Sequence, residues 1–204
     1  MEIICLYSQD YRSNTFLACS QGHCAIIDPG LRTNAITEAI DKYELTPDFV
    51  LLTHGHFDHI FSLDAIRAIY NIPAFVHKND AEMLTDSVKN AYSFFFGDLF
   101  KQKAPEKTFT DGDKLPIGNE FLTVIHTPGH SKGSSCFSCN DILITGDTLF
   151  AAGIGRTDLH GGDMETIYSS LLSLRSIPSG DKITIYPGHG RSEILSKALD
   201  NVIY

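Results

Sequence analysis

The sequence predicts an α/β protein in which two sheets lie face to face and helices cover their outer sides. Three observations support this prediction. Short apolar runs of strand length occur in both halves of the chain. Segments with apolar residues at helical spacing follow several of these runs. Clusters of histidine and aspartate come directly after strand-like runs, which is where ligand sites form in α/β sheets.

The length and composition indicate one domain. The chain has 204 residues, of which 43% are hydrophobic and 20% are charged, as in ordinary globular proteins. A chain of this size buries roughly 70% of the surface that its unfolded form exposes, which is enough for one sizeable core. The sequence contains no linker, low-complexity run or short-period repeat. We therefore expect a single domain over residues 1–204.

Charge and cysteine usage suggest where the protein works and which partners it lacks. The formal charge of −9 and the pI near 5.3 argue against a nucleic-acid surface, which is usually basic. No apolar run approaches the roughly 20 residues that span a bilayer, and residues 1–5 show no feature of a signal peptide. The five cysteines fit reduced core thiols. We expect a cytoplasmic monomer or homodimer with a small-molecule substrate and without nucleic-acid or membrane partners.

The first half of the chain predicts strands alternating with helices. Strands are expected at three apolar runs near the start: Ile3–Tyr7, Thr15–Ser20 and His23–Asp28. Apolar residues at helical spacing predict two helices: Asn34–Tyr43 and Ile60–Tyr70. A short buried strand, Phe49–Thr53, is expected between them, and Ala74–His77 predicts another strand. Asn79-Asp80 is the candidate cap of a short helix that runs through Met83.

The second half repeats the order of strands followed by helices. Strands are expected at four apolar runs: Phe121–His126, Ser134–Ser138, Ile142–Gly146 and Ile183–Tyr186. Helices are expected at two segments: Met164–Ile177 and Ser192–Val202. Residues 86–107 predict no regular element. Their Phe94–Phe96 run suits an apolar core or a dimer contact better than a lid or an acyl-binding wall.

Five histidines and two aspartates form the chemical pattern of the chain. They occur in four short motifs at strand ends: Thr53-His54-Gly55-His56-Phe57-Asp58-His59, Thr127-Pro128-Gly129-His130, Thr145-Gly146-Asp147-Thr148 and Tyr186-Pro187-Gly188-His189-Gly190. Imidazole nitrogen and carboxylate oxygen bind zinc, but seven ligands are too many for one tetrahedral ion. They suit two divalent ions about 3.5–4 Å apart that share a bridging carboxylate. This inventory predicts a hydrolytic site.

Backbone geometry indicates how the ligands are shared. Residues two apart on an extended strand point the same way, so His54 and His56 can reach one ion if the strand stays extended. Asp58 and His59 fall where the chain turns into the next helix, so they face a second position. Asp147 stands at the end of an apolar strand, which suits a bridge between the ions.

The four motifs resemble those of the metallo-β-lactamase-fold hydrolases over nearly the whole chain. Within that superfamily, the set THGHFDH, TPGHS, TGDTLF and YPGHG is most similar to the glyoxalase II group, especially its short single-domain members. The resemblance implies a four-layer αβ/βα sandwich with two mixed sheets and outer helices. It also implies a role for each ligand: His54, His56 and His130 hold the first ion, Asp58, His59 and His189 hold the second, and Asp147 bridges. Zinc is the expected metal, with iron or manganese as alternatives.

The resemblance implies hydrolysis of a thioester, similar to the cleavage of S-D-lactoylglutathione to D-lactate and glutathione. A metal-bound water that loses its proton near neutral pH would attack the carbonyl, and the ions would stabilise the oxyanion. Asp58 is a candidate catalytic residue that accepts a proton besides being a ligand. The longer glyoxalase II enzymes hold glutathione with an additional helical domain, whereas this sequence has room for one helix after His189. The acyl group and the thiol carrier are therefore left open.

A persulfide dioxygenase of the same fold is the alternative function. In those enzymes a loop resembles Gly153-Ile154-Gly155-Arg156-Thr157-Asp158, and residues matching His54, His130 and Asp147 bind a single iron while oxygen is consumed. Nucleic-acid processing by a tRNase Z-like enzyme is less compatible with the acidic charge. A non-catalytic metal protein would not need an open site for water.

Arg156 is the expected substrate-binding residue. A basic residue of this loop can contact the substrate's carboxylate in the resembled family, and a guanidinium suits that group. The alternative is an ion pair with Asp158 that fixes the loop. Cys136 and Cys139 are three apart on a strand and should face opposite ways, which argues against a redox or metal role. Three histidines outside the motifs are expected to be structural: His23, His77 and His126.

Overall fold

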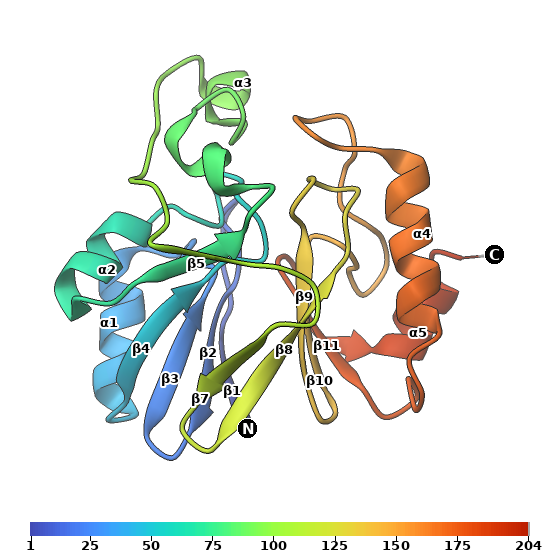
Figure 1. The fold of residues 1–204 in the computed structure, drawn as a ribbon, viewed down its shortest axis with the longest axis horizontal. Helices are drawn as coiled ribbons and strands as arrows, with labels where there is room; N and C mark the ends of the chain where they lie inside the picture. Colours follow the sequence, from blue (N-terminus) through green and yellow to red (C-terminus); the bar gives the residue numbers. More distant parts are fainter. Residues whose placement is uncertain (204) are drawn as a thin grey trace.

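The computed structural model describes residues 1–203 and contains two six-stranded mixed sheets packed face to face, with helices outside (Figure 1). The outer side of the first sheet carries α1 (Thr33–Lys42) and α2 (Leu63–Tyr70). The outer side of the second carries α4 (Met164–Arg175) and α5 (Leu195–Asp200). This arrangement confirms the predicted α/β sandwich.

The first sheet has the strand order β1-β2-β3-β4-β5-β6. Its strands are β1 (Glu2–Leu6), β2 (Thr15–Ser20), β3 (His23–Ile27), β4 (Thr46–Leu51), β5 (Ala74–His77) and β6 (Lys107–Phe109). The first three strands pair antiparallel, and β3 to β6 pair parallel. Parallel neighbours need a crossover, which α1 provides before β4 and α2 after it. The segment after β4 therefore emerges at the edge where the carboxyl ends of the parallel strands meet.

The second sheet has the strand order β12-β11-β10-β9-β8-β7. Its strands are β7 (Lys114–Ile117), β8 (Glu120–His126), β9 (Ser135–Cys139), β10 (Ile142–Gly146), β11 (Thr184–Pro187) and β12 (Glu193–Ile194). β10 and β11 pair parallel across the α4 crossover, and the other neighbours pair antiparallel. The carboxyl ends of β10 and β11 consequently lie side by side.

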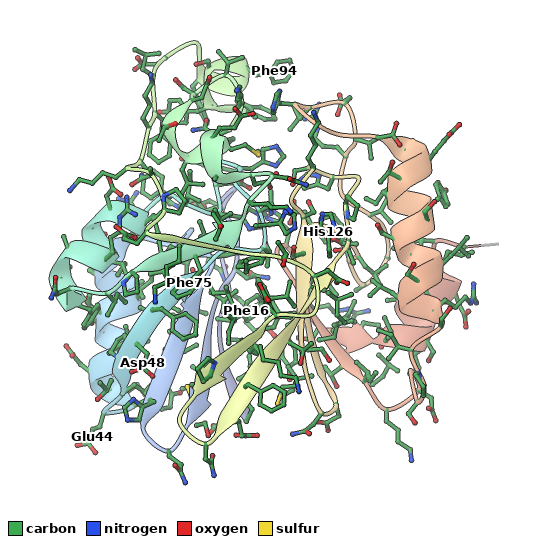
Figure 2. All side chains as sticks on the ribbon, in the orientation of Figure 1. Phe16, Glu44, Asp48, Phe75, Phe94 and His126 are labelled. Atoms are coloured by element: carbon green, nitrogen blue, oxygen red, sulfur yellow. The ribbon has the colours of Figure 1, made fainter. Side chains whose placement is uncertain are left out.

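Alternation along the strands divides the apolar side chains among three layers. In β2, Leu17 packs toward α1 and α2, whereas Phe16 packs between the sheets (Figure 2). Phe137 of β9 and Ile144 of β10 join Phe16 in the central layer, and all three are fully buried. Leu143, next to Ile144, packs in the outer layer under α4 and α5. Because both faces of each sheet are covered, the strands form a rigid support for the loops at their ends.

Several local predictions were wrong or incomplete. Residues 86–107 contain the short helix α3 (Tyr92–Phe96), which has no buried residue, so a core role of the Phe94–Phe96 run is wrong, whereas a dimer contact stays a prediction. The predicted helix Ser192–Val202 begins as β12, because that segment pairs with β11, and α5 starts only at Leu195. Asp80 precedes the 3-10 helix η1 (Ala81–Thr85), but its side chain does not cap that helix.

Three of the five cysteines lie in the core, Cys19, Cys24 and Cys136, and two are partly exposed, Cys5 and Cys139. All five are free within residues 1–203, and burial raises the pKa of Cys24 to about 12 and that of Cys136 to about 11. Cys136 packs under the outer helices and Cys139 against the central layer, which confirms that they face opposite sides of β9. Among the helices of this same range, none is both long enough and apolar enough to cross a membrane.

Candidate metal centre

The seven predicted ligands converge at one edge of the sandwich. They come from four segments: the loop after β4 (His54, His56, Asp58 and His59), the β8–β9 loop (His130), the end of β10 (Asp147) and the end of β11 (His189). β4 ends at Leu51, so the first two histidines lie in irregular backbone beyond the strand. Both sheets therefore contribute ligands to one site.

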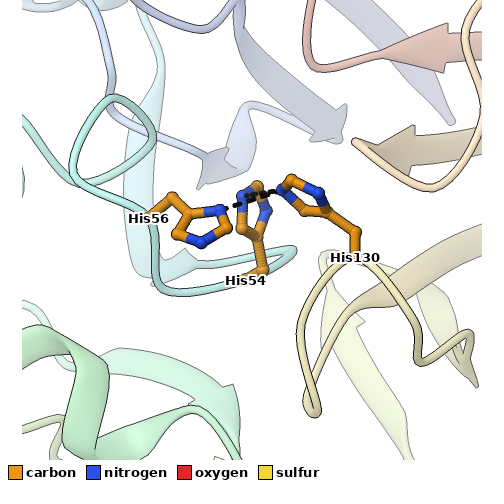
Figure 3. A group of neighbouring side chains, drawn as sticks. All are labelled: His54, His56 and His130. Carbon is orange, nitrogen blue, oxygen red and sulfur yellow. Dashed lines mark hydrogen bonds between the residues drawn. The ribbon is translucent and has the colours of Figure 1, made fainter. Parts of the chain in front are cut away.

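His54, His56 and His130 form the first ligand group (Figure 3). Nε2 of His130 lies 3.2 Å from Nε2 of His54 and 2.9 Å from Nδ1 of His56. All three side chains are buried. Nitrogens bound to one tetrahedral zinc at about 2.0–2.1 Å would lie roughly 3.3 Å apart. The observed spacing is therefore close to that of three ligands of a single ion.

Asp58, His59 and His189 form the second group. Oδ2 of Asp58 lies 3.1 Å from Nε2 of His189 and 3.8 Å from Nε2 of His59. Asp147 lies near both groups: its Oδ1 is 3.3 Å from His59 Nε2, and its Oδ2 is 3.6 Å from Nε2 of both His130 and His189. The position of Asp147 is the one expected of a bridging carboxylate.

Three buried polar atoms of the cluster have no hydrogen-bond partner among the described residues: Nε2 of His56, Nε2 of His59 and Oδ1 of Asp147. The last two lie 3.3 Å apart. An unsatisfied buried polar group costs about 1–3 kcal/mol. A divalent cation between the two atoms would satisfy both at once. Imidazole nitrogen together with carboxylate oxygen is a ligand set that zinc accepts and that also suits iron. The residues present therefore fit a pair of divalent ions.

The protonation states of the imidazoles also favour cation binding. Burial, supported by the neighbouring histidines, lowers the pKa of His54 well below its ordinary value and that of His56 to about 3. Both rings are therefore neutral at pH 7, which is the form that binds metals. At His59, burial alone would lower the pKa, but the surrounding carboxylates, Asp147 foremost, raise it. Divalent ions would replace the proton as the charge that balances these carboxylates.

Asp28, at the end of β3, orients two of the ligands. Its Oδ2 accepts hydrogen bonds from Nδ1 of His59 at 2.8 Å and from Oγ1 of Thr53 at 2.6 Å. The Thr53 oxygen in turn accepts from Nδ1 of His54 at 3.1 Å. Both imidazoles thus direct Nε2 toward the centre, as in metal sites whose ligands are held by an outer layer of hydrogen bonds.

Asp80 joins the two loops that carry the first ligand group. Its buried carboxylate accepts from Oγ of Ser131 at 2.6 Å, from the amide of Gly133 at 2.6 Å and from the amide of Gly55 at 3.3 Å. Gly55 lies between two of the ligating histidines, and Ser131 directly follows the third. The sequence did not predict these roles of Asp28 and Asp80, because their partners lie 25 to 53 residues away.

Gly188 lets the last turn pass close to the centre. A Cβ at this position would lie 2.3 Å from Oδ1 of Asp147 and 2.6 Å from Cε1 of His59. Any side chain there would displace the carboxylate of Asp147. The Pro187-Gly188-His189 sequence therefore allows the backbone to pack closely against Asp147 and positions His189 at the site.

A cavity of about 360 Å³ adjoins the ligands, within the roughly 300–1,000 Å³ of typical small-molecule sites. Its other lining residues are mainly apolar: Tyr11, Phe57, Ala91, Phe95, Phe96, Phe150, Gly155 and Leu159. Arg156 also lines the cavity, but its guanidinium donates two hydrogen bonds to Asp158, at 2.6 and 2.7 Å. The ion pair considered as the alternative is thus present, and a substrate contact by Arg156 stays a prediction.

Known proteins with similar sequences support a metal-dependent hydrolase. A family model described as the metallo-beta-lactamase superfamily matches residues 9–189. "Probable metallo-hydrolase YqgX" of Bacillus subtilis is 36% identical, covering 93% of this chain and 91% of its own length. "Hydroxyacylglutathione hydrolase GloC" of Haemophilus influenzae is 31% identical, with corresponding coverages of 82% and 80%.

Two solved structures agree with the fold over almost the full length. BLEG-1 B3 metallo-beta-lactamase superimposes with a TM-score of 0.88 and 30% identity, covering 98% of this chain and 97% of that one. TTHA1623 in a di-iron-bound form gives a TM-score of 0.84 and 27% identity, with coverages of 95% and 96%. The family match extends from before the first ligand motif to His189. The chain therefore belongs to the metallo-beta-lactamase superfamily.

Proposed function

We propose that this metal-dependent hydrolase cleaves thioesters and uses two divalent ions, most simply zinc. The observation that carries the proposal is the pair of three-residue ligand groups that share Asp147 beside one cavity. When bound, the two ions would supply a water that is acidic near neutral pH and a Lewis acid for a carbonyl oxygen. A thioester suits such a site, because its thiolate leaving group requires little protonation.

The protein's own side chains would orient the reactants and accept a proton. Asp58 lines the cavity, and its Oδ2 lies 3.1 Å from Nε2 of His189. Burial alone would raise the pKa of Asp58, but His59 and His189 lower it below its ordinary value. The carboxylate is therefore ionised at neutral pH and can accept a proton at Oδ2.

The named relatives support attack of water on an acyl carbon. GloC is named as a hydroxyacylglutathione hydrolase, which makes S-D-lactoylglutathione the first thioester to test. BLEG-1 is named as a B3 metallo-beta-lactamase, so the amide of a β-lactam is a second candidate bond. The thioester is preferred because this chain matches the short glyoxalase II pattern at every ligand position.

A single-iron persulfide dioxygenase is the competing proposal. Such a site would need His54, His130 and Asp147, but not the second ligand group. The convergence of Asp58, His59 and His189 supports the two-ion hydrolase. Iron remains a candidate metal for the hydrolase as well, since TTHA1623 is described in a di-iron-bound form.

Elemental analysis combined with a substrate panel tests the proposed function. Purified protein would be loaded with zinc, iron or manganese, freed of excess metal and assayed with S-D-lactoylglutathione, S-acetyl-N-acetylcysteamine, a β-lactam, and glutathione persulfide at an oxygen electrode. We expect two ions per chain and thioester hydrolysis that a chelator abolishes and added metal restores. One iron per chain with oxygen uptake, or loaded protein that leaves every thioester intact, would refute the proposal.

We also propose a cytoplasmic location, a small-molecule substrate, a monomeric or homodimeric state, and no nucleic-acid or membrane partner. The free cysteines and the formal charge of −9 support these points.

A further inference from the structure

We infer that the cavity selects thioesters whose acyl group carries an apolar, ring-sized substituent, in preference to small hydrophilic acyl groups such as lactoyl. The inference rests on the proposed thioester hydrolysis and specifies its substrate class. It is carried by four aromatic side chains that line the cavity and that we call the aromatic wall: Tyr11, Phe57, Phe95 and Phe96.

Phe57 anchors the aromatic wall directly beside the ligands. It lies between His56 and Asp58 in the sequence, and only 6% of its surface is exposed. Its ring centroid is 6.1 Å from that of Tyr11, 5.7 Å from Phe95 and 5.5 Å from Phe96. These are the separations of interacting aromatic pairs. The rings therefore form a continuous apolar surface that begins at Phe57, the residue between the predicted ligands His56 and Asp58.

The other members of the aromatic wall keep a large exposed surface. Tyr11 is 52% exposed, Phe95 47% and Phe96 49%. They come from two distant segments, the loop before β2 and helix α3, which lies beyond the ends of the strands (Figure 1). Exposed aromatic rings from separate segments that gather around a cavity mark a binding surface. An apolar group that fills the cavity would remove these rings from water, which is favourable.

The cavity offers little to a hydrophilic acyl group. Apart from the predicted metal ligands, Arg156 is the one charged side chain among the lining residues in the described part of the chain. Its two hydrogen bonds to Asp158 engage the guanidinium, whose carbon lies 5.4 Å from the ring centroid of Phe95. A lactoyl hydroxyl would thus find mainly rings in front of it. A phenyl or branched alkyl group would find complementary contacts.

The acyl end of the thioester fits the aromatic wall better than the thiol end. Peptide and nucleotide thiols carry several charged groups, which require polar partners when they are buried. The aromatic wall supplies no charged partner, so a large thiol carrier is expected to extend toward solvent. The scissile carbonyl must lie beside the ligands, which places its acyl substituent within a few bonds of Phe57.

Two series of thioesters test this assignment on the metal-loaded protein. In the first, the thiol is N-acetylcysteamine and the acyl group changes from lactoyl and acetyl to 3-methylbutanoyl and phenylacetyl. In the second, the acyl group is phenylacetyl and the thiol changes from N-acetylcysteamine to glutathione. We expect kcat/KM to rise at least about tenfold from acetyl to phenylacetyl, since apolar contacts discriminate by such factors, and to change less across the thiols.

The outcomes separate the inference from the proposed function. Thioester hydrolysis with lactoyl equal to or better than phenylacetyl would overturn the inference and leave the proposed function intact. A stronger dependence on the thiol than on the acyl group would assign the aromatic wall to the leaving group and also overturn it. Hydrolysis of no thioester at all would refute both.

Phe95→Ala and Phe94→Ala form a matched pair of variants. The two residues are neighbours in α3, but Phe95 lines the cavity, whereas Phe94 does not and is 67% exposed. We expect Phe95→Ala to reduce the preference for phenylacetyl over acetyl about tenfold and Phe94→Ala to retain it. The same preference in both variants would contradict the inference.

A binding measurement gives a readout that does not depend on metal or turnover. S-phenacyl-N-acetylcysteamine is a ketone thioether that hydrolysis cannot cleave, and its binding to metal-free protein can be followed by calorimetry. We expect a negative heat-capacity change of binding, the mark of apolar burial, and weaker binding by Phe95→Ala than by Phe94→Ala. Equal binding by the two variants would count against the aromatic wall.

Discussion

The ligands of the metal centre depend on residues that stand behind them. A neutral imidazole has one donor nitrogen and one acceptor nitrogen. A fixed hydrogen-bond acceptor beside the ring binds the donor nitrogen, so the acceptor nitrogen faces the opposite side, where an ion can bind. Asp28 provides this acceptor for His59 directly and for His54 through Thr53. One carboxylate outside the ligand set thus orients a histidine of each group.

Replacing Asp28 by Asn should weaken metal binding about 10–100-fold, the usual effect of losing such a partner. The amide keeps the size of the side chain but loses the charge and one of the acceptor oxygens. Affinity can be measured by competition with a chromophoric chelator. Asp48→Asn is the control, because Asp48 also lies 3.0 Å from a histidine nitrogen, Nδ1 of His23, but at a partly exposed position of β4. Equal losses in both variants would rule out a specific role for Asp28.

The sharing of ligands between two ions predicts different losses for single substitutions. His59→Ala removes a ligand of the second group alone and should leave one ion per chain. Asp147→Ala removes the bridge and should lower both the metal content and the hydrolysis rate. Elemental analysis after gel filtration measures the stoichiometry. Two ions retained in His59→Ala, or unchanged metal in Asp147→Ala, would show that the assignment of ligands is wrong.

Between elements, Asp80 connects a loop of the first sheet to a loop of the second. Hydrogen bonds to a charged group are worth about 1.5–3 kcal/mol, so Asp80→Asn should lower the free energy of unfolding by roughly that amount in urea titrations of metal-free protein. The same substitution should also lower the affinity for the first ion more than the affinity for the second. Asp86→Asn is the control, since Asp86 accepts backbone hydrogen bonds at 2.9 and 3.2 Å in an exposed turn. No difference between the two variants would contradict the proposed link.

A histidine pair between the sheets predicts a pH dependence of stability. His77 of β5 stacks on His126 of β8, with ring centroids 4.1 Å apart, and burial together with His126 lowers the pKa of His77 to about 4. The unfolded chain, with an ordinary pKa of 6.5, binds more protons between those values. This contribution to stability is therefore complete above pH 6.5 and is lost on acidification toward pH 4. In metal-free protein, the midpoint of urea unfolding should fall less between pH 7 and pH 5 in His77→Phe than in the unchanged protein. An equal fall in both proteins would contradict this prediction.

At the scale of the whole molecule, we expect the proposed metal centre to cross-link the two sheets. Its ligands follow β4 of the first sheet and β8, β10 and β11 of the second. Ions that bind only the folded chain stabilise it, by about 4 kcal/mol when present at a thousand times their dissociation constant. Chelation should therefore lower the midpoint of thermal unfolding in calorimetry, and added metal should restore it. An unchanged midpoint after verified metal removal would contradict this cross-link.

The sequence by itself determined which histidines and aspartates converge at the candidate site, and most of the regular elements. Strands such as β2, β5 and β10 are short apolar runs whose pattern is local, and the predicted ranges agree with the structure. The ligand motifs are also local, because each places its histidines or aspartates in the segment that follows a strand. Such features need no knowledge of distant partners, so they can be recognised along the chain.

Only the tertiary structure decided which residues support and surround the centre. The roles of Asp28 and Asp80 depend on hydrogen-bond partners far away in the sequence. The strand β12 exists because its backbone pairs with β11. The rings of α3 look like core residues along the chain, but the fold leaves them exposed beside the cavity. Periodicity records which residues are apolar, whereas the packing of distant segments decides what those residues face.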